Sequence, residues 1–369
     1  MLDAEKTKKE TAREQRIFRH GGNIYAPSPT GKWLDFSANI NPMGMADEVA
    51  DTIRAHIVDL VHYPEPNAVR LRQAIGKACG IPMEAVLPGN GASDLLYLLF
   101  EMIRPAHVLL PIPTFSEYER AALAARSRVR YFGLLPDMGF RPDMGKLLGA
   151  CPATNVLVLC NPNNPTGVLL HREAVEMLAM AMKGRDQWLV VDESFLDFRA
   201  DGTRESVLPL VMRYPHLLVL RSMTKFYALP GLRLGFLAAH PDTVRRLRRG
   251  RDIWAVNTLA QEAGITALGL PDYAEKSRAL VKREGAFLHE AMERMGIGSL
   301  APTVNFLLLD LHKTGCTAAD LAERLRAHGI LIRDCSNYPG LDAYYARIAV
   351  RTQKENQTLV QAMEEAIQC

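Results

Sequence analysis

Short apolar runs, each ending at a polar residue, are the feature of this sequence that most constrains its fold. Between about residues 45 and 250 they alternate with helical stretches, and three of them span 156–159, 188–191 and 217–220. Strands that alternate with helices predict a doubly wound α/β fold with a mostly parallel sheet. Ligands of such sheets bind outside the carboxyl ends of the strands, so the polar residues after these runs form the candidate site.

Lys225 is the most informative of these residues. It follows the run 217–220, with Ser222 before it and Arg233 after it. A lysine buried at the end of a strand loses hydration, which lowers its pKa and makes the neutral amine available to attack an aldehyde. Ser222 and Arg233 could hold a phosphate. A single Ser-x-x-Lys is more often a surface lysine after a strand, but two motifs upstream favour the functional interpretation.

Both upstream motifs also follow apolar runs. The segment 161–167 reads Asn-Pro-Asn-Asn-Pro-Thr-Gly, in which the prolines stop the strand and fix a turn. Asp192 ends the run 188–191. An ordinary turn and a helix-capping carboxylate are the alternative interpretations. However, Asn164, Asp192 and Lys225 all come just beyond a strand, and one pocket could therefore collect them together with Arg233.

This ordered set resembles the fold-type I enzymes that use pyridoxal 5'-phosphate (PLP), the aminotransferase class I and II superfamily. The resemblance implies that Lys225 forms a Schiff base with PLP, that Asp192 pairs with the pyridine nitrogen, and that Asn164 hydrogen-bonds the 3'-oxygen. PLP stores the electrons released when a bond at the substrate's Cα breaks, and a protonated nitrogen makes it a better sink. Members often have a tyrosine three residues after the aspartate, where this chain has Phe195.

A glycine-rich turn upstream suits the cofactor phosphate. Gly91, Ala92 and Ser93 open the stretch 95–103, which the pattern predicts to be a helix. Backbone amides at a helix start favour an anion. Such a turn alone is more often structural, but the superfamily binds the PLP phosphate at this position.

Two aromatic residues complete the implied cofactor site. Phe115 would stack on the cofactor ring, although an isolated phenylalanine is more often part of a core. Tyr63 resembles the tyrosine that reaches the phosphate from the neighbouring subunit, and this implies a homodimer.

Segments near the two ends of the chain indicate a narrower group within this superfamily. The segments 20–23, 34–42 and 330–341, with 221–235, closely resemble the threonine-phosphate decarboxylases of cobalamin biosynthesis, which are related to histidinol-phosphate aminotransferases. The similarity runs from about His20 to the C-terminus. It implies that the substrate's phosphate and carboxylate bind to a group of residues near one end of the pocket: Arg333, Arg347, His20, Asn39 and Ile40.

Arginine side chains suit a substrate with more than one negative group. A guanidinium group grips carboxylate or phosphate with two parallel hydrogen bonds and stays charged at physiological pH. Which of Arg333 and Arg347 holds which group stays open. For Arg351, a surface ion pair and a substrate contact are almost equally favoured.

The resemblance implies a PLP-dependent carboxy-lyase that converts L-threonine O-3-phosphate to (R)-1-amino-2-propanol O-2-phosphate and CO2. The first alternative is a histidinol-phosphate aminotransferase, which would share the whole PLP set. The second is decarboxylation of L-serine O-phosphate to ethanolamine phosphate, since one methyl group is worth only about 1–3 kcal/mol of discrimination. The third is a noncatalytic PLP-binding regulator, but we expect the residues before His20 to be too few for a DNA-binding module.

The resemblance and the chain length predict two domains. We expect a fold-type I PLP-dependent transferase, with an N-terminal segment over 1–44 that packs with the small domain, a large PLP-binding domain over 45–255 and a smaller α/β domain over 256–369. In the small domain the pattern predicts helices and strands over 273–295, 304–311, 318–328 and 330–333. Residues 1–17 are expected to be helical or frayed.

Composition fits a cytoplasmic enzyme of metabolism, and the resemblance implies a small-molecule substrate, a phosphorylated amino acid. The net charge of +3 argues against a nucleic-acid or membrane-surface partner. The six cysteines have no metal-ligand spacing, so we expect reduced thiols and no metal site. The apolar runs are shorter than a membrane span, and the polar N-terminus lacks the apolar core of a secretory signal.

Overall fold

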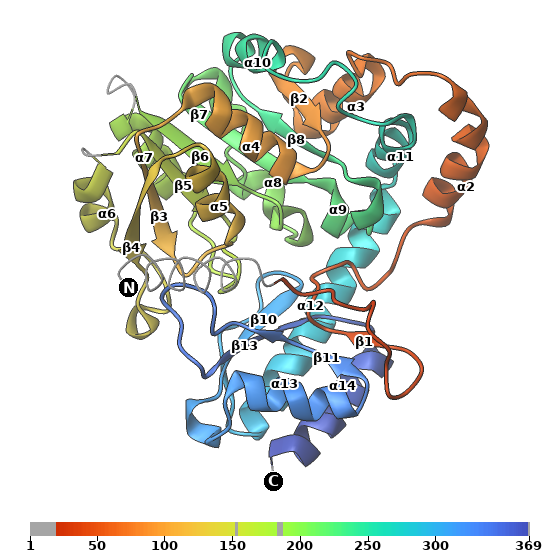
Figure 1. The fold of residues 1–369 in the computed structure, drawn as a ribbon, viewed down its shortest axis with the longest axis vertical. Helices are drawn as coiled ribbons and strands as arrows, with labels where there is room; N and C mark the ends of the chain where they lie inside the picture. Colours follow the sequence, from red (N-terminus) through yellow and green to blue (C-terminus); the bar gives the residue numbers. More distant parts are fainter. Residues whose placement is uncertain (1–19, 152–153, 183–186, 368–369) are drawn as a thin grey trace, which may run out of the picture.

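A large domain and a small domain are joined by one long helix, α12 (Pro271–Arg294) (Figure 1). The computed structural model describes residues 20–151, 154–182 and 187–367. The expectation for residues 1–17 lies outside the described residues. Among the described residues, no helix combines the length and the apolar character that crossing a membrane requires.

A seven-stranded sheet forms the centre of the large domain. In this sheet only β8 runs antiparallel to its neighbours, so the sheet is mostly parallel, as predicted. In sheet order the strands are β2 (Val86–Gly89), β8 (Gly235–Ala238), β7 (Leu217–Ser222), β6 (Trp188–Asp192), β5 (Val156–Cys160), β3 (His107–Ile112) and β4 (Arg128–Gly133).

Both faces of this sheet are buried, which explains why its central strands are apolar runs without alternation. Successive side chains point to opposite faces. Leu157 and Leu159 therefore belong to one core cluster, and Val156 and Val158 belong to another. The helices that cover the first face are α3 (Val69–Cys79), α6 (Met144–Ala150), α7 (Arg172–Met182) and α11 (Thr258–Leu268). Those on the second are α4 (Ala92–Ile103), α5 (Glu117–Ala124) and α10 (Pro241–Arg248).

Three shorter or peripheral helices also belong to this domain among the described residues. They are α2 (Asp47–His56), α8 (Gly202–Glu205) and α9 (Met223–Phe226). Val49 of α2 packs against Ala263 of α11, and Ala260 of α11 lies in the first core cluster. The domain boundary at residue 255 stays a prediction, and α11, which follows it, packs with the large domain.

The small domain has a separate core between an antiparallel sheet and helices. Its strands, in sheet order, are β12 (Arg333–Asp334), β13 (Tyr345–Ala349), β10 (Phe306–Asp310) and β9 (Gly298–Ser299). Its helices are α13 (Ala318–Ala327) and α14 (Gln353–Ile367). The N-terminal segment joins this domain, because β1 (Leu34–Asp35) pairs in parallel with β11 (Ile330–Leu331) and Phe36 lies in the same core.

Candidate active site

Three predicted site residues follow adjacent parallel strands. Strand β5 pairs with β6, which pairs with β7, and Cys160 at the end of β5 is in register with Asp192. Asn164 follows β5, Asp192 ends β6, and Lys225 lies in α9 directly after β7. The carboxyl ends of these strands meet at one edge of the sheet, which faces the small domain (Figure 1).

The Lys225 amine lies in a partly apolar environment. Its Nζ donates to Ser222 Oγ at 3.2 Å and lies 5.4 Å from the centre of the Phe195 ring. Burial lowers the pKa of Lys225 below its ordinary value; the charge of Asp192 opposes this effect in part, and the cationic Arg233 adds to it. A lowered pKa raises the fraction of neutral amine, which is the form that attacks an aldehyde.

The backbone around Lys225 is held by a residue that the sequence analysis did not select. The backbone N–H of Asn41 donates to the Lys225 carbonyl at 3.0 Å, and its Nδ2 donates to the Phe226 carbonyl at 2.7 Å. Tyr273 of α12 donates to the same Phe226 carbonyl at 3.2 Å. Asn41 belongs to the segment 34–42 used for the family resemblance, and its position two residues after Asn39 was the available signal.

Asp192 is buried, and both of its carboxylate oxygens accept a hydrogen bond. The Ser194 backbone N–H donates to Oδ1 at 2.9 Å, and the Tyr118 hydroxyl donates to Oδ2 at 2.7 Å. A buried carboxylate needs such partners, because burial without them costs several kcal/mol. The sequence analysis did not select Tyr118.

An anion cradle lies at the start of α4. Gly91 precedes the helix with φ of 87°, and no side chain caps this helix end in the described structure. A Cβ on Gly91 would lie 2.4 Å from an Arg233 guanidinium nitrogen. A Cβ on Gly235 would lie 2.6 Å from the Ala92 amide nitrogen. The structure thus brings Arg233 to the first turn of α4, which also contains Ser93, and amides and a cation together favour a phosphate.

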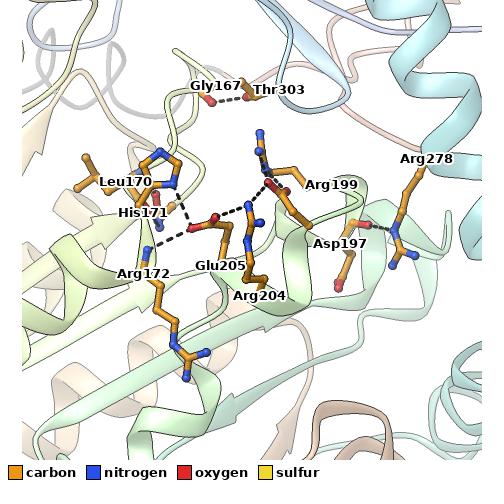
Figure 2. Close-up of polar contacts among 12 residues, drawn as sticks. Gly167, Leu170, His171, Arg172, Asp197, Arg199, Arg204, Glu205, Arg278 and Thr303 are labelled. Carbon is orange, nitrogen blue, oxygen red and sulfur yellow. Dashed lines mark hydrogen bonds and ion pairs between the residues drawn. The ribbon is translucent and has the colours of Figure 1, made fainter.

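The loop that carries Asn164 contacts the small domain at two points. The Arg347 guanidinium donates to Asn164 Oδ1 and, at 2.8 Å, to the Ser37 carbonyl. Three residues further on, Thr303 Oγ1 donates to the Gly167 carbonyl (Figure 2). Because the Asn164 oxygen accepts from Arg347, its amide nitrogen is the group available to donate to a ligand.

Arg333 and Arg347 lie opposite each other on paired strands β12 and β13. Arg333 donates to Asn337 Oδ1 at 2.7 Å, and its guanidinium lies 5.3 Å from the centre of the Tyr338 ring. Two buried polar atoms here have no hydrogen-bond partner among the described residues, namely Arg347 Nε and Asn39 Oδ1. Ile40, the neighbour of Asn39, is partly buried. The register thus sets two guanidinium-bearing residues opposite each other, and one of them, Arg347, contacts Asn164.

His20 contacts a carboxylate that the sequence analysis did not select. Its Nε2 lies 3.0 Å from Glu117 Oε1, and its ring centre lies 5.9 Å from that of Phe115. Burial alone would raise the pKa of Glu117, but His20 and Arg120 together hold it below its ordinary value. Glu117 comes two residues after Phe115, and no sequence signal linked it to His20.

Two predicted residues lie away from this group. The Tyr63 side chain is 77% exposed and stacks on Trp254 at 4.5 Å between ring centres. Arg351 forms an ion pair with Glu355 of α14 at 2.8 Å, which favours the surface-ion-pair alternative. The described residues contain no group of three or more His, Cys, Asp or Glu side chains that could hold a metal ion.

Residues 31–363 match the family described as aminotransferase class I and II. The chain belongs to this family. It is 34% identical to the threonine-phosphate decarboxylase of Salmonella typhimurium, over 94% of this chain and 96% of that protein. Among solved structures, it is similar to L-threonine-O-3-phosphate decarboxylase from Porphyromonas gingivalis, with 30% identity, a TM-score of 0.80, and coverage of 90% and 99% of the two chains. It is also similar to histidinol-phosphate aminotransferase from Clostridium acetobutylicum, with 27% identity, a TM-score of 0.84, and coverage of 90% and 98%.

Membership of the aminotransferase class I and II family confirms the predicted fold-type I architecture, the prediction of an enzyme and PLP as the cofactor. The described site fits that cofactor. The close approach of Arg233 to Gly91 leaves no room for a larger residue at the phosphate cradle, Lys225 supplies an amine of lowered pKa, and Asp192 supplies a buried carboxylate.

Proposed function

We propose that this chain decarboxylates L-threonine O-3-phosphate to (R)-1-amino-2-propanol O-2-phosphate and CO2 in cobalamin biosynthesis. The observation that carries the proposal is the register pair Arg333 and Arg347, of which Arg347 contacts Asn164. Two guanidinium groups suit a substrate with a phosphate and a carboxylate. The threonine-phosphate decarboxylase of Salmonella typhimurium, similar over nearly the whole length of both chains, supports it.

The proposed cofactor site uses the three strand-end residues. Lys225 would bind PLP covalently through its amine, Asp192 would pair with the pyridine nitrogen, and Asn164 would donate to the 3'-oxygen. When bound, the cofactor stores the electron pair released at the substrate's Cα. The phosphate would lie against the residues of the anion cradle: Gly91, Ala92, Ser93, Ser222 and Arg233. Phe115 would stack on the ring.

In the proposal, the residues that bind the substrate determine which bond at Cα breaks. A decarboxylase would have to present the bond to the carboxylate, and not the Cα hydrogen, to the electron sink that the cofactor would supply. In the proposal, Arg333 and Arg347 grip the two anionic groups and impose this orientation, with His20, Asn39 and Ile40 at the same end. After CO2 leaves, the Lys225 amine would return a proton to Cα.

We also propose that the enzyme is a cytoplasmic homodimer in which Tyr63 serves the partner's cofactor phosphate. Supporting this, Tyr63 is exposed and follows a 3-10 helix, η1 (Ile57–Val61), that carries exposed apolar side chains: Ile57, Val58, Leu60 and Val61. Apolar patches of this kind mark protein interfaces. Analytical ultracentrifugation of the wild type and of Val61→Asp tests this. A monomeric wild type with full activity would contradict it.

The test of function is a turnover assay with L-threonine O-3-phosphate and PLP-loaded protein, without a keto acid. Sustained release of CO2 and amine over many turnovers is expected. Histidinol-phosphate aminotransferase is the second candidate, favoured by the TM-score of 0.84. No CO2, with stoichiometric conversion of the cofactor to its pyridoxamine form, would support that candidate instead. L-serine O-phosphate in the same assay measures the contribution of the substrate methyl group.

A further inference from the structure

We propose that Tyr118 is a positioning residue that holds the Asp192 carboxylate in place for the pyridine nitrogen of the bound cofactor. This inference rests on the proposed cofactor site and adds to it a residue of α5, which lies outside the strand-end motifs. Tyr118 and Asp192 are 74 residues apart in the sequence.

The geometry fixes the carboxylate from both sides. Tyr118 donates to Oδ2 at 2.7 Å while the Ser194 backbone N–H donates to Oδ1 at 2.9 Å. Rotation of the carboxylate would break both bonds. Tyr118 is 1% exposed and Asp192 is 7% exposed, so water does not compete effectively for these bonds. A hydrogen bond to a charged group is shorter and stronger than one between neutral groups, and burial strengthens it further.

The Tyr118 hydroxyl stays protonated in this environment and can therefore donate a hydrogen bond. Burial raises the pKa of Tyr118 well above its ordinary value, and the charge of Asp192 raises it further. The hydroxyl therefore keeps its proton at any pH at which the enzyme works. It is held by a rigid frame, because Tyr118 and its helix neighbours Ala121 and Ala122 lie in the core between α5 and the sheet.

Tyr118 also contacts the aromatic residue expected to stack on the cofactor. The Tyr118 and Phe115 rings meet edge to face, with their centres 5.6 Å apart. Aromatic pairs favour this arrangement. One side chain thus fixes both the carboxylate at the pyridine nitrogen and the ring that covers the cofactor face.

This contact has a chemical consequence for the electron sink. Hydrogen-bond donors withdraw charge from a carboxylate and make it a poorer competitor for a shared proton. With Tyr118 in place, the proton between Asp192 and the pyridine nitrogen stays on the nitrogen, which keeps the cofactor a good electron sink. Loss of the hydroxyl moves that proton toward Asp192.

The test variant is Tyr118→Phe, which removes the hydroxyl and keeps the ring. Tyr214→Phe is the matched control, because Tyr214 donates to a carboxylate, Glu176 Oε1, at 2.9 Å on another part of the large domain. The measurements are the Kd for PLP and the 15N chemical shift of pyridine-labelled PLP in the holoenzyme. We expect Tyr118→Phe to weaken PLP binding about tenfold, as for one lost hydrogen bond to a charged group. We also expect its 15N shift to move toward the unprotonated value, and the control to match the wild type.

A double-mutant cycle with Asp192→Asn separates positioning from packing. If Tyr118 acts through Asp192, then Tyr118→Phe has little further effect on PLP affinity in the Asp192→Asn background. In the turnover assay, kcat should fall while KM for threonine phosphate stays unchanged. A wild-type 15N shift in Tyr118→Phe, or an equal effect in both backgrounds, would overturn the proposal. The cofactor readouts need no substrate, so a failed decarboxylation assay would count against the proposed function alone.

Discussion

In the large domain, Asn164, Asp192 and Lys225 lie at the ends of three adjacent strands of one sheet, whereas Arg333 and Arg347 belong to the small domain and His20 to the N-terminal segment. The first group is placed by the hydrogen-bonded register of one sheet. The second depends on contacts between distant segments, such as Arg347 with Ser37 and His20 with Glu117. Perturbing the first group should therefore damage the chemistry, and perturbing the second should mainly damage substrate binding.

The largest effect is expected for Lys225→Ala. Loss of the amine should lower kcat by at least about 10²–10⁴-fold, the usual contribution of one proton-transfer group, and should remove the absorbance of lysine-bound cofactor. Absorbance spectra and the CO2 assay measure both. Lys146→Ala, at an exposed lysine, is the control. A Lys225→Ala variant that kept both the cofactor absorbance and CO2 release would contradict the role of Lys225 in binding PLP.

Arg347→Lys should produce the next largest effect. It keeps the charge but loses the paired geometry of the guanidinium, including the contacts with Asn164 and Ser37. We expect KM for threonine phosphate to rise about 10- to 100-fold, as for lost hydrogen bonds to a charged group. Steady-state kinetics measure the effect on substrate binding, and the Kd for PLP measures the effect on cofactor binding. A loss of PLP affinity larger than the rise in KM would contradict the assignment of Arg347 to substrate binding.

Glu117→Gln should have a smaller effect, confined to the substrate side. The amide keeps the shape of the side chain but loses the charge that pairs with His20. KM should rise about fivefold, the effect of one modest hydrogen bond, and kcat should change little. Glu101→Gln, at an exposed glutamate, is the kinetic control. If kcat fell instead, His20 would belong to the chemical step and not to binding.

The smallest effect concerns stability of the small domain. His312 contacts Asp310 at 2.6 Å and Asp342 at 3.0 Å, and these partners raise its pKa above the ordinary value. A raised pKa in the folded state gives stability that is fully present below the unfolded pKa, about 6.5, and is lost as pH rises through the folded value. His312→Asn should thus lower Tm more at pH 5.5 than at pH 8.5. Equal losses in thermal unfolding at both values would contradict this.

The strand-end residues could be predicted because their signal is local. A strand that is buried on both faces can be recognised in the sequence as an apolar run, and so can the polar residue that ends it. Tyr118, Asn41 and Glu117 could not be predicted in this way. Their partners lie 74, 185 and 97 residues away, and no local pattern records such contacts. The sequence analysis drew the domain boundary before α11, whose packing against α2 and α3 no local pattern records.

The sequence by itself determined the parallel sheet, the family and the residue types at the ends of β5, β6 and β7, because burial and strand termination act over a few neighbouring residues. Only the tertiary structure decided which distant groups hold them. Tyr118 reaches Asp192 because α5 packs on the sheet, and Arg347 reaches Asn164 because the small domain closes against the large one. Such contacts follow from how whole layers pack, so they exist only once the chain has folded.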